Sequence, residues 1–346
     1  MTYFPSPFLP DETAKSENVD LGFVVNSGKN ALRLVLRSFS LKEGANVGIP
    51  AFCCDAVFQA VKEEKLTPCF FDLKEEEGYW ADYSKETIKE KNIEAIILTH
   101  LYGFIHPDTK SIMEFCEKEG VALIHDAAQS FGINSSVLGN KAIVYSFGPG
   151  KSTTAAMGGE IVNFKGNGIS IKKIGLADSQ NAKLFFKSRL NEYKFSFLDK
   201  LLLKIFSKLK SNESDFIELS EFQKQKAKEA KWIVLNKGSE RVLRYEHLMR
   251  SIKEQSSVKI AYDSEEGLKF KIVLYISGDP DKFVKYLFSN NIHFFRLYDS
   301  IDVEERLKAE LPFFKKSGKR IIEISTERSI PMPEMDRIAK VLEAYK

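Results

Sequence analysis

The sequence predicts an α/β fold, with a mostly parallel sheet flanked by helices and a smaller α+β domain after it. Helical and strand patterns alternate at short intervals from Gly28 to about Phe164, as they do in successive βαβ units. Further along the chain the pattern changes to long helical stretches and then to a mixture of strand and helix signals. We therefore expect a large domain over residues 1–220, including a helical excursion at about 176–215, and a small C-terminal domain over residues 221–346.

Short apolar runs and helical spacing define the elements of the large domain. We expect helices at residues 30–39, 55–65 and 109–119, and strands at residues 47–49, 68–73, 95–99, 121–124 and 143–147. Parallel strands present their carboxyl ends at one edge of the sheet, where ligands bind in open α/β folds. Three of these strands end near Thr99, Asp126 and Ser146, so the sequence predicts a ligand site at that edge.

The C-terminal half contains a Phe-rich basic stretch. Residues 182–210 place Phe, Leu and Ile among many Lys and Arg at helical spacing, which predicts one or two amphipathic helices. Such helices either pack on their own domain or on a neighbouring subunit, or present a basic face to anionic lipid. Beyond them we expect helices at residues 221–234, 280–290 and 334–345, and a strand at residues 270–276.

Composition excludes several classes of protein. The chain has 51 basic and 48 acidic residues and a net charge of +3, so no global charge excess attracts nucleic acid. No apolar run approaches the roughly 20 residues that span a bilayer, and the N-terminal segment lacks the pattern of a secretory signal. The four cysteines form neither a metal-binding nor a disulfide-dense pattern. We therefore expect a cytoplasmic protein without a transmembrane segment, a bound metal or a nucleic-acid partner.

A glycine-rich turn presents a single lysine, Lys151. The segment from Ser146 to Ser152 reads SFGPGKS and follows an expected strand. Its glycines allow backbone N–H groups to approach an anion, and Ser146 adds a hydroxyl. The turn superficially resembles the phosphate loop of nucleotide hydrolases, but that loop requires a glycine at the position of Tyr145. The spacing therefore excludes a nucleotide hydrolase.

A carboxylate, Asp126, stands at the end of an apolar strand. Considered alone, it is either a helix N-cap or a functional group. A pyridine-based electron sink needs a carboxylate at its ring nitrogen, a lysine that forms an imine, and donors for its phosphate. Asp126, Lys151 and Ser146 are candidates for these three roles at strand ends along one edge, and together they predict the cofactor pyridoxal 5'-phosphate.

Five motifs, in the same order along the chain, carry a family resemblance. They are SGKNAL at 27–32, IPAF at 49–52, THLYG at 99–103, IHDAAQSFG at 124–132 and SFGPGKSTTAAMGGEIV at 146–162. This set resembles the DegT/DnrJ/EryC1/StrS family of pyridoxal-phosphate-dependent sugar aminotransferases. The resemblance implies an aspartate-aminotransferase-like fold, which is fold type I of these enzymes, and a homodimer with active sites at the subunit boundary. Residues 326–345 look like the closing segment of the family.

The resemblance also implies a role for each matching residue. Lys151 would hold the cofactor as an internal aldimine and then shuttle a proton between substrate and cofactor. Asp126 would pair with the pyridinium nitrogen, Gln129 would lie by the phenolic oxygen, and Ser146 would bind the phosphate. The backbone at Gly28 and Lys29 would close the phosphate site at the start of a helix.

Four positions depart from the family or leave alternatives open. Cys54 stands where relatives place an aromatic ring that stacks on the cofactor, and Phe52 is the alternative source of that ring face. Lys29 replaces a phosphate-binding hydroxyl, so its ammonium either binds the same anion or points to solvent. His100 lies near the cofactor in the family motif or is a core histidine.

A further departure concerns the segment that relatives extend to the partner subunit. Phe216 and Glu218 align with the asparagine and arginine of the family's Asn-x-Arg stretch, whose asparagine reaches the partner's cofactor phosphate. The cross-subunit part of the site, and with it the substrate, is therefore expected to differ from that of relatives.

The expected function is transfer of an amino group from an amino acid, with glutamate as the expected donor, to a nucleotide-linked keto-sugar, in polysaccharide or antigen biosynthesis. The presence of Lys151 favours this activity over the family's dehydratase relatives, in which a histidine replaces the lysine. Two alternatives stay open. One is a pyridoxal-phosphate enzyme that acts on a different carbonyl or amino substrate, and the other is a non-catalytic regulatory or assembly protein of the same fold.

Overall fold

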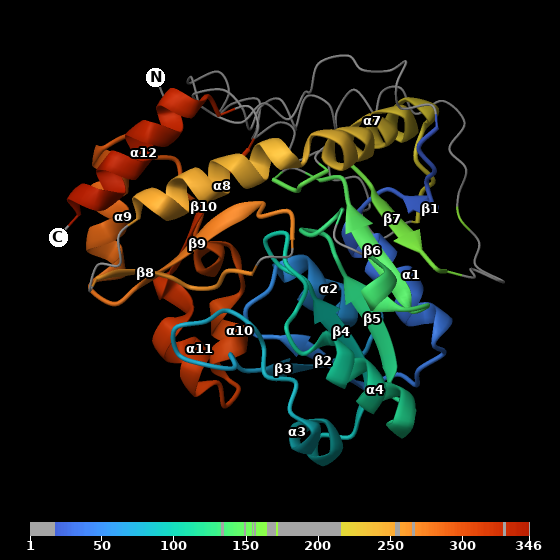
Figure 1. Ribbon diagram of the computed structural model, residues 1–346. Coiled ribbons are helices and arrows are strands. Elements are labelled where there is room, and N and C mark those ends of the chain that lie inside the picture. The colour runs from blue at the N-terminus through green and yellow to red at the C-terminus, as the bar shows by residue number, and fades with distance from the viewer. Residues whose placement is uncertain are drawn as a thin grey trace, which may run out of the picture.

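The computed structural model describes residues 18–132, 135–148, 150–153, 155, 157–164, 171, 216–252, 257–264, 267–327 and 330–345. Figure 1 shows a large sheet with its helices on one side of the molecule and a smaller sheet with its own helices on the other. The predicted helical excursion at 176–215, including the basic stretch 182–210, lies outside the described residues.

The large sheet has seven strands in the order β1-β7-β6-β5-β4-β2-β3. They are β1 (Phe23–Val25), β2 (Asn46–Pro50), β3 (Thr67–Phe71), β4 (Ile93–Thr99), β5 (Ala122–Asp126), β6 (Ala142–Ser146) and β7 (Gly159–Val162). Strands β2 to β6 pair in parallel, and β7 pairs antiparallel with both β6 and β1. The predicted mostly parallel sheet is therefore confirmed.

Helices cover both faces of this sheet because successive side chains of a strand point to opposite faces. On β4, Ala95 and Ile97 belong to the core that also contains the buried residues of α1 (Gly28–Ser38) and α2 (Asp55–Glu63). Ile96 and Leu98 instead belong to a second core with α3 (Lys85–Glu90) and α4 (Thr109–Glu119). A strand buried on both faces reads as a continuous apolar run, as residues 95–98 do.

The second sheet is antiparallel, with the order β10-β9-β8. Its strands are β8 (Val258–Ile260), β9 (Lys271–Ile276) and β10 (Ile321–Ser325). The helices of this half are α7 (Glu221–Lys237), α8 (Ser239–Ser251), α9 (Pro280–Ser289), α10 (Val303–Leu307), α11 (Pro312–Ser317) and α12 (Met332–Ala344). In Figure 1, α7 lies above the large sheet and α8 continues toward the small one. The domain boundary at 220/221 stays a prediction.

No helix in the described part of the chain is long and apolar enough to cross a membrane.

A buried polar contact joins the two sheets. Tyr102 lies in the loop after β4 with a left-handed backbone, φ +59°, and its hydroxyl donates to Glu323 Oε1 of β10 at 2.6 Å. The carboxylate of Glu323 also pairs with the ammonium of Lys271 on β9. Backbone bonds reinforce the contact, because Leu268 N donates to Gly103 O at 2.9 Å and Phe270 N donates to Tyr102 O at 2.9 Å. The loop after β4 is thus fixed to the small sheet.

A buried ion pair fixes α7 to the large sheet. Glu160 of β7 is completely buried, and its Oε1 accepts from Lys231 Nζ of α7 at 2.8 Å and from Gly22 N at 2.6 Å. Lys231 Nζ also donates to the carbonyl of Asp20 at 2.7 Å. A buried charge that loses its partner is costly, so this pair holds the N-terminal segment, β7 and α7 together.

Substitution Lys231→Met should therefore destabilise the protein by about 3 to 5 kcal/mol, because it leaves the Glu160 carboxylate buried without its cation. Lys224→Met on the same helix is the matched control, since Lys224 pairs with Glu218 and with the exposed Glu221 and should cost at most about 1 kcal/mol. Urea unfolding of the three proteins measures both values. Equal losses in the two variants would contradict the role given to the buried pair.

Candidate active site

The strand ends that the sequence predicts at one edge of the sheet do converge there. Strands β4, β5 and β6 end at Thr99, Asp126 and Ser146, and the register pairs Thr99 with Asp126 directly. All three side chains are buried, with at most 8% of each residue exposed. Three polar groups that are distant in sequence therefore lie side by side at the carboxyl edge of the sheet.

The start of α1 lies directly against the end of β6. A methyl group built on Gly28 would lie 3.0 Å from both the Cβ and the Oγ of Ser146, so only a glycine leaves this space open. Ser146 Oγ accepts from Gly148 N at 3.3 Å, and Ser146 O accepts from Thr153 Oγ1 at 3.0 Å. A helix N-terminus beside a hydroxyl and a glycine-rich turn is suited to an anion such as phosphate. The structure thus brings together Gly28 and Ser146, as the sequence predicts.

The side chain of Lys29 takes part in an ion pair. Its Nζ lies 2.6 Å from Glu63 Oε1 on α2, and 17% of the side chain is exposed. The sequence left two alternatives for this ammonium, binding of the cofactor phosphate or exposure to solvent. The structure instead shows an ion pair with Glu63. The proposed backbone role of Lys29 at the phosphate stays a prediction.

Asp126 is a buried carboxylate close to a lysine. Its Oδ1 accepts from Ala128 N at 3.0 Å. Burial raises the pKa of Asp126 above its usual value, while the Ala128 N–H and the positive charge of Lys151 act in the opposite direction. The carboxylate therefore lies within electrostatic range of Lys151, and a cation placed against it would stabilise its charged form.

The turn that carries Lys151 has an unusual backbone. Gly150 adopts φ +71° and Met157 adopts φ +66°, and Lys151 is partly buried. The neighbouring Ser152 has a buried Oγ that finds no hydrogen-bond partner among the described residues, while its carbonyl accepts from Arg241 Nη2 at 3.2 Å. A buried hydroxyl without a partner is unusual in a folded protein and suits a site that receives a polar ligand.

The loop that follows Asp126 is fixed to the loop after β4. Gln129 is buried and its Oε1 lies 3.4 Å from Tyr102 N. Ser130 Oγ donates to His100 O at 2.9 Å and accepts from Gly103 N at 3.2 Å. Gln129 is thus held near Asp126, although its predicted place beside a phenolic oxygen stays a prediction.

His100 belongs to a buried network of histidines. Its Nε2 lies 3.0 Å from Nδ1 of His125, and its Nδ1 accepts from His106 N at 3.1 Å. Burial, His125 and His106 all lower the pKa of His100 well below its usual value, so the ring is neutral. Of the two alternatives for this residue, the structure supports the core histidine.

The β2–α2 loop, residues 51–54, contains the position predicted to stack on the cofactor. Phe52 is fully buried in the main core, so its ring offers no exposed face, and this does not support Phe52 as the stacking residue. Cys54 is the partly exposed N-cap residue of α2, and its role at the ring stays a prediction. The pKa of the Cys53 thiol is raised to about 12, mainly by burial, and the negative charge of Asp126 acts in the same direction. The loop therefore lies within electrostatic range of Asp126.

Phe216 lies in its own chain against α1. The guanidinium carbons of Arg33 and Arg37 lie 4.8 and 4.5 Å from the centre of its ring, and the next carbonyl, of Ile217, accepts from Asn26 N at 2.8 Å. Glu218 pairs with Lys224 at 2.8 Å. Apolar and cationic contacts within one chain therefore hold this segment in place.

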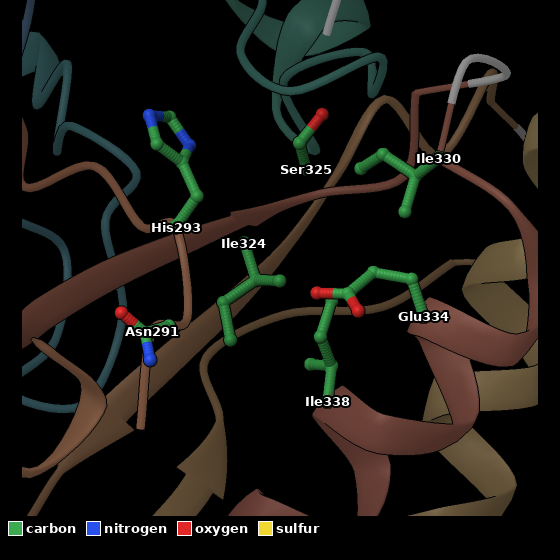
Figure 2. A pocket seen from close by; sticks show the side chains of 7 residues that line it. All are labelled: Asn291, His293, Ile324, Ser325, Ile330, Glu334 and Ile338. Atoms are coloured by element: carbon green, nitrogen blue, oxygen red, sulfur yellow. The ribbon is translucent and has the colours of Figure 1, made fainter. Parts of the chain in front are cut away.

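A small cavity in the C-terminal half is separate from this edge. Its lining residues are Asn291, His293, Ile324, Ser325, Ile330, Glu334 and Ile338, and Figure 2 shows Glu334 and Ile338 projecting from α12 toward Ile324. Its volume of about 10 Å³ has room for about one water molecule. Among the described residues, no group of His, Cys, Asp and Glu side chains is arranged to hold a metal ion.

Substitution Asp126→Asn should raise the thermal stability of the cofactor-free protein at pH 7, by roughly 3 °C. The raised pKa means that the charged form of Asp126 is disfavoured in the folded state, and this cost is present above the folded pKa and absent below the usual carboxyl pKa. The gain should therefore vanish near pH 3. Scanning calorimetry at both pH values measures it.

Asp281→Asn is the control of opposite sign, because a hydrogen bond from Arg296 lowers the pKa of Asp281. It should bring no gain at pH 7. A loss of stability in Asp126→Asn at pH 7 would contradict the burial cost assigned to this carboxylate.

Known proteins resemble less than half of the chain in sequence. A UDP-N-acetyl-3-dehydro-alpha-D-glucosamine 3-aminotransferase of Acidithiobacillus ferrooxidans is 33% identical over 158 residues, which make up 44% of this chain and 42% of the relative. A GDP-perosamine synthase of Escherichia coli O157:H7 is 28% identical over 176 residues, which make up 46% of this chain and 48% of the relative. The chain thus matches less than half the length of either relative.

A solved structure shares the fold along almost the whole chain. The sugar aminotransferase CalS13 from Micromonospora echinospora superposes with a TM-score of 0.70 at 14% identity, covering 99% of this chain and 100% of that one. This likeness confirms the predicted aspartate-aminotransferase-like fold, which is fold type I of the pyridoxal-phosphate enzymes.

A family model matches part of the sequence directly. Residues 12–180 match the model of the DegT/DnrJ/EryC1/StrS aminotransferase family, and this region contains α1, the carboxyl edge of β4 to β6, and the turn with Lys151. The five motifs that carry the resemblance in the sequence all lie within it. Through these residues, just under half of the chain, the protein is similar to the DegT/DnrJ/EryC1/StrS aminotransferase family.

Proposed function

We propose that this chain is a pyridoxal-phosphate-dependent aminotransferase, which moves an amino group from an amino acid to a nucleotide-linked keto-sugar. The observation that carries the proposal is the place of Asp126. Its buried carboxylate lies within electrostatic range of Lys151, at the sheet edge where Gly28 and Ser146 also meet. The family match supports the same chemistry, since members of this family depend on pyridoxal phosphate.

The residues present fit this cofactor. Gly28 leaves beside Ser146 a space that a methyl group would fill, and this space adjoins the N-terminus of an 11-residue helix, as a phosphate site requires. Asp126 offers a buried carboxylate, which gains stability from a cationic ring nitrogen. Lys151 offers a primary amine on the turn that follows β6. One acid, one amine and one anion site are the protein groups that this cofactor needs.

The residues have distinct tasks in the proposed reaction. When bound, pyridoxal phosphate supplies an aromatic ring that accepts the electron pair released as a C–H bond of the amino donor breaks. Asp126 holds a proton on the ring nitrogen, and Gln129 orients the ring from the loop that follows. The amine of Lys151 would take the proton from the donor carbon and pass it to the cofactor carbon that is bonded to the same nitrogen. Gly28 and Ser146 hold the phosphate and so fix the position of the ring.

Glutamate as donor and a nucleotide-linked keto-sugar as acceptor are part of the proposal. The names of the two relatives support the acceptor, because one is an aminotransferase of a UDP-linked sugar and the other is a GDP-perosamine synthase. We also propose a homodimer that acts in the cytoplasm in polysaccharide or antigen biosynthesis, as the family resemblance implies.

One observation favours a second candidate. Phe216 stands where relatives carry an asparagine, and it is enclosed by Arg33 and Arg37 of its own chain. A changed substrate side would suit a pyridoxal-phosphate enzyme that acts on another carbonyl or amino substrate. A screen of amino donors in the half-reaction, followed by absorbance, separates the two, since a response restricted to glutamate supports the first candidate.

Substitution Gly28→Ala should weaken the binding of pyridoxal phosphate by about tenfold or more, because the added methyl group lies 3.0 Å from Ser146 in the phosphate site. Gly278→Ala is the matched control, since a methyl group there meets its nearest neighbour, Ser257, only at 4.0 Å. Titration of the cofactor-free proteins with pyridoxal phosphate, followed by fluorescence, measures the affinities. An unchanged affinity in Gly28→Ala would remove Gly28 from the site.

Substitution Lys151→Ala should reduce amino transfer by about a thousandfold or more, because no other group is proposed to move the proton. The wild-type protein should be yellow, and borohydride should fix the cofactor on the peptide that contains Lys151, as mass spectrometry would show. Purified protein is then incubated with glutamate and candidate nucleotide keto-sugars. A yellow protein that consumes no glutamate with any of them would count against the proposed reaction, and equal activity of Lys151→Ala would exclude it.

A further inference from the structure

Arg306, on α10 in the C-terminal half, is a completely buried arginine. Its Nε donates to the carbonyl of Ala51 at 2.8 Å, and its Nη2 lies 3.4 Å from the carbonyl of Cys53. Its Nη1 donates to Asp55 Oδ1 at 3.0 Å and to the carbonyl of Asp302 at 2.8 Å. Three of these four acceptors belong to the β2–α2 loop or to the residue that follows it.

A carboxylate and two aromatic rings stabilise the buried charge of Arg306. Asp55 provides the opposite charge, and the rings of Phe70 and Phe58 lie 5.2 and 5.8 Å from the guanidinium carbon. Only arginine has a planar group with donors that can reach several carbonyl oxygens at once. A lysine at this place has one ammonium and cannot keep all four contacts.

A second hydrogen bond of Asp55 strengthens the link between the β2–α2 loop and α10. Its Oδ1 also accepts from Asp302 N at 3.0 Å, while Asp302 Oδ1 caps α10 by accepting from Glu305 N at 3.0 Å. The start of α2 and the start of α10 are therefore held to the same carboxylate. The β2–α2 loop has its position fixed by an element about 250 residues later in the chain.

This loop adjoins the proposed cofactor site. It leaves the carboxyl end of β2 in the sheet whose edge carries Asp126, and the charge of Asp126 is felt at Cys53. Cys54, the next residue, occupies the position that faces the cofactor ring by family resemblance.

We infer that Arg306 is a positioning residue, which holds the β2–α2 loop against the ring of the bound cofactor and makes cofactor affinity depend on the C-terminal half of the chain. The inference rests on the proposed function, because it assumes that pyridoxal phosphate binds beside Asp126. Arg306 itself touches neither the cofactor nor the substrate.

The test compares Arg306→Lys with Arg320→Lys. Arg320 is the matched control, because its Nη1 also donates to backbone carbonyls, those of Ile276 and Ser277 at the end of β9, at 2.8 and 3.0 Å. Two readouts are taken: hydrogen exchange of the amides of residues 51–57 in the cofactor-free protein, and the dissociation constant of pyridoxal phosphate. Arg306→Lys should speed the exchange and raise the dissociation constant, each by about tenfold, and Arg320→Lys should change neither by more than about twofold.

Asp55→Asn is the second variant, and it decides the question if Arg306→Lys does not fold. It keeps the shape of the side chain but removes the charge opposite Arg306, so both effects should appear at about threefold. Unchanged exchange in the loop would overturn the inference, and so would faster exchange with unchanged cofactor affinity. If wild-type protein binds no pyridoxal phosphate, the proposed function fails, and the exchange data alone still show whether Arg306 holds the loop.

Discussion

The buried carboxylate of Asp126 is the constraint on which the rest of the site depends. A charged group at the end of an apolar strand is unfavourable unless a cation or several N–H groups compensate it. The described structure gives it one N–H bond, from Ala128, and the nearby charge of Lys151, and its pKa still lies above the usual value. The protein keeps an incompletely compensated acid here, which is typical of a functional site rather than of a site selected for stability.

The surrounding structure holds this acid in place from both halves of the chain. His100 N donates to Asp126 O at 2.8 Å, and Ser130 connects the loop after β5 to the loop after β4. That second loop is in turn joined to the small sheet through Tyr102 and Glu323. The geometry of the edge is therefore set by tertiary contacts and not by the strands alone.

Much of this architecture could be predicted from local sequence, and the reasons are physical. The helix expected at 109–119 is found with these bounds, and it ends at Gly120, which adopts φ +71°, a conformation that other residues avoid. Strands buried on both faces produce continuous apolar runs, so the expected ends of the parallel strands all lie within two residues of the observed ends. By contrast β1 and β7 were not predicted, because strands of three and four residues carry little pattern and pair across 138 positions, as Phe23 does with Ile161.

The details of the site show the same limit. Lys29 pairs with Glu63 only because α1 and α2 pack together, and Arg306 meets Asp55 across 251 positions, so neither contact has a local signal. Motif spacing could place Asp126, Ser146 and Gly28 at one edge, since strand ends converge there. It could not show whether Phe52 is exposed, because this depends on how the β2–α2 loop packs into the core.

The central claim is that Asp126 keeps the ring nitrogen of the cofactor protonated. The most direct measurement is nuclear magnetic resonance of the protein loaded with pyridoxal phosphate that carries an isotopic label at this nitrogen. We expect the chemical shift of a protonated nitrogen at neutral pH in the wild-type protein, and the chemical shift of an unprotonated nitrogen in Asp126→Asn. An unprotonated ring nitrogen in the wild-type protein, or the same protonated signal in both proteins, would contradict it.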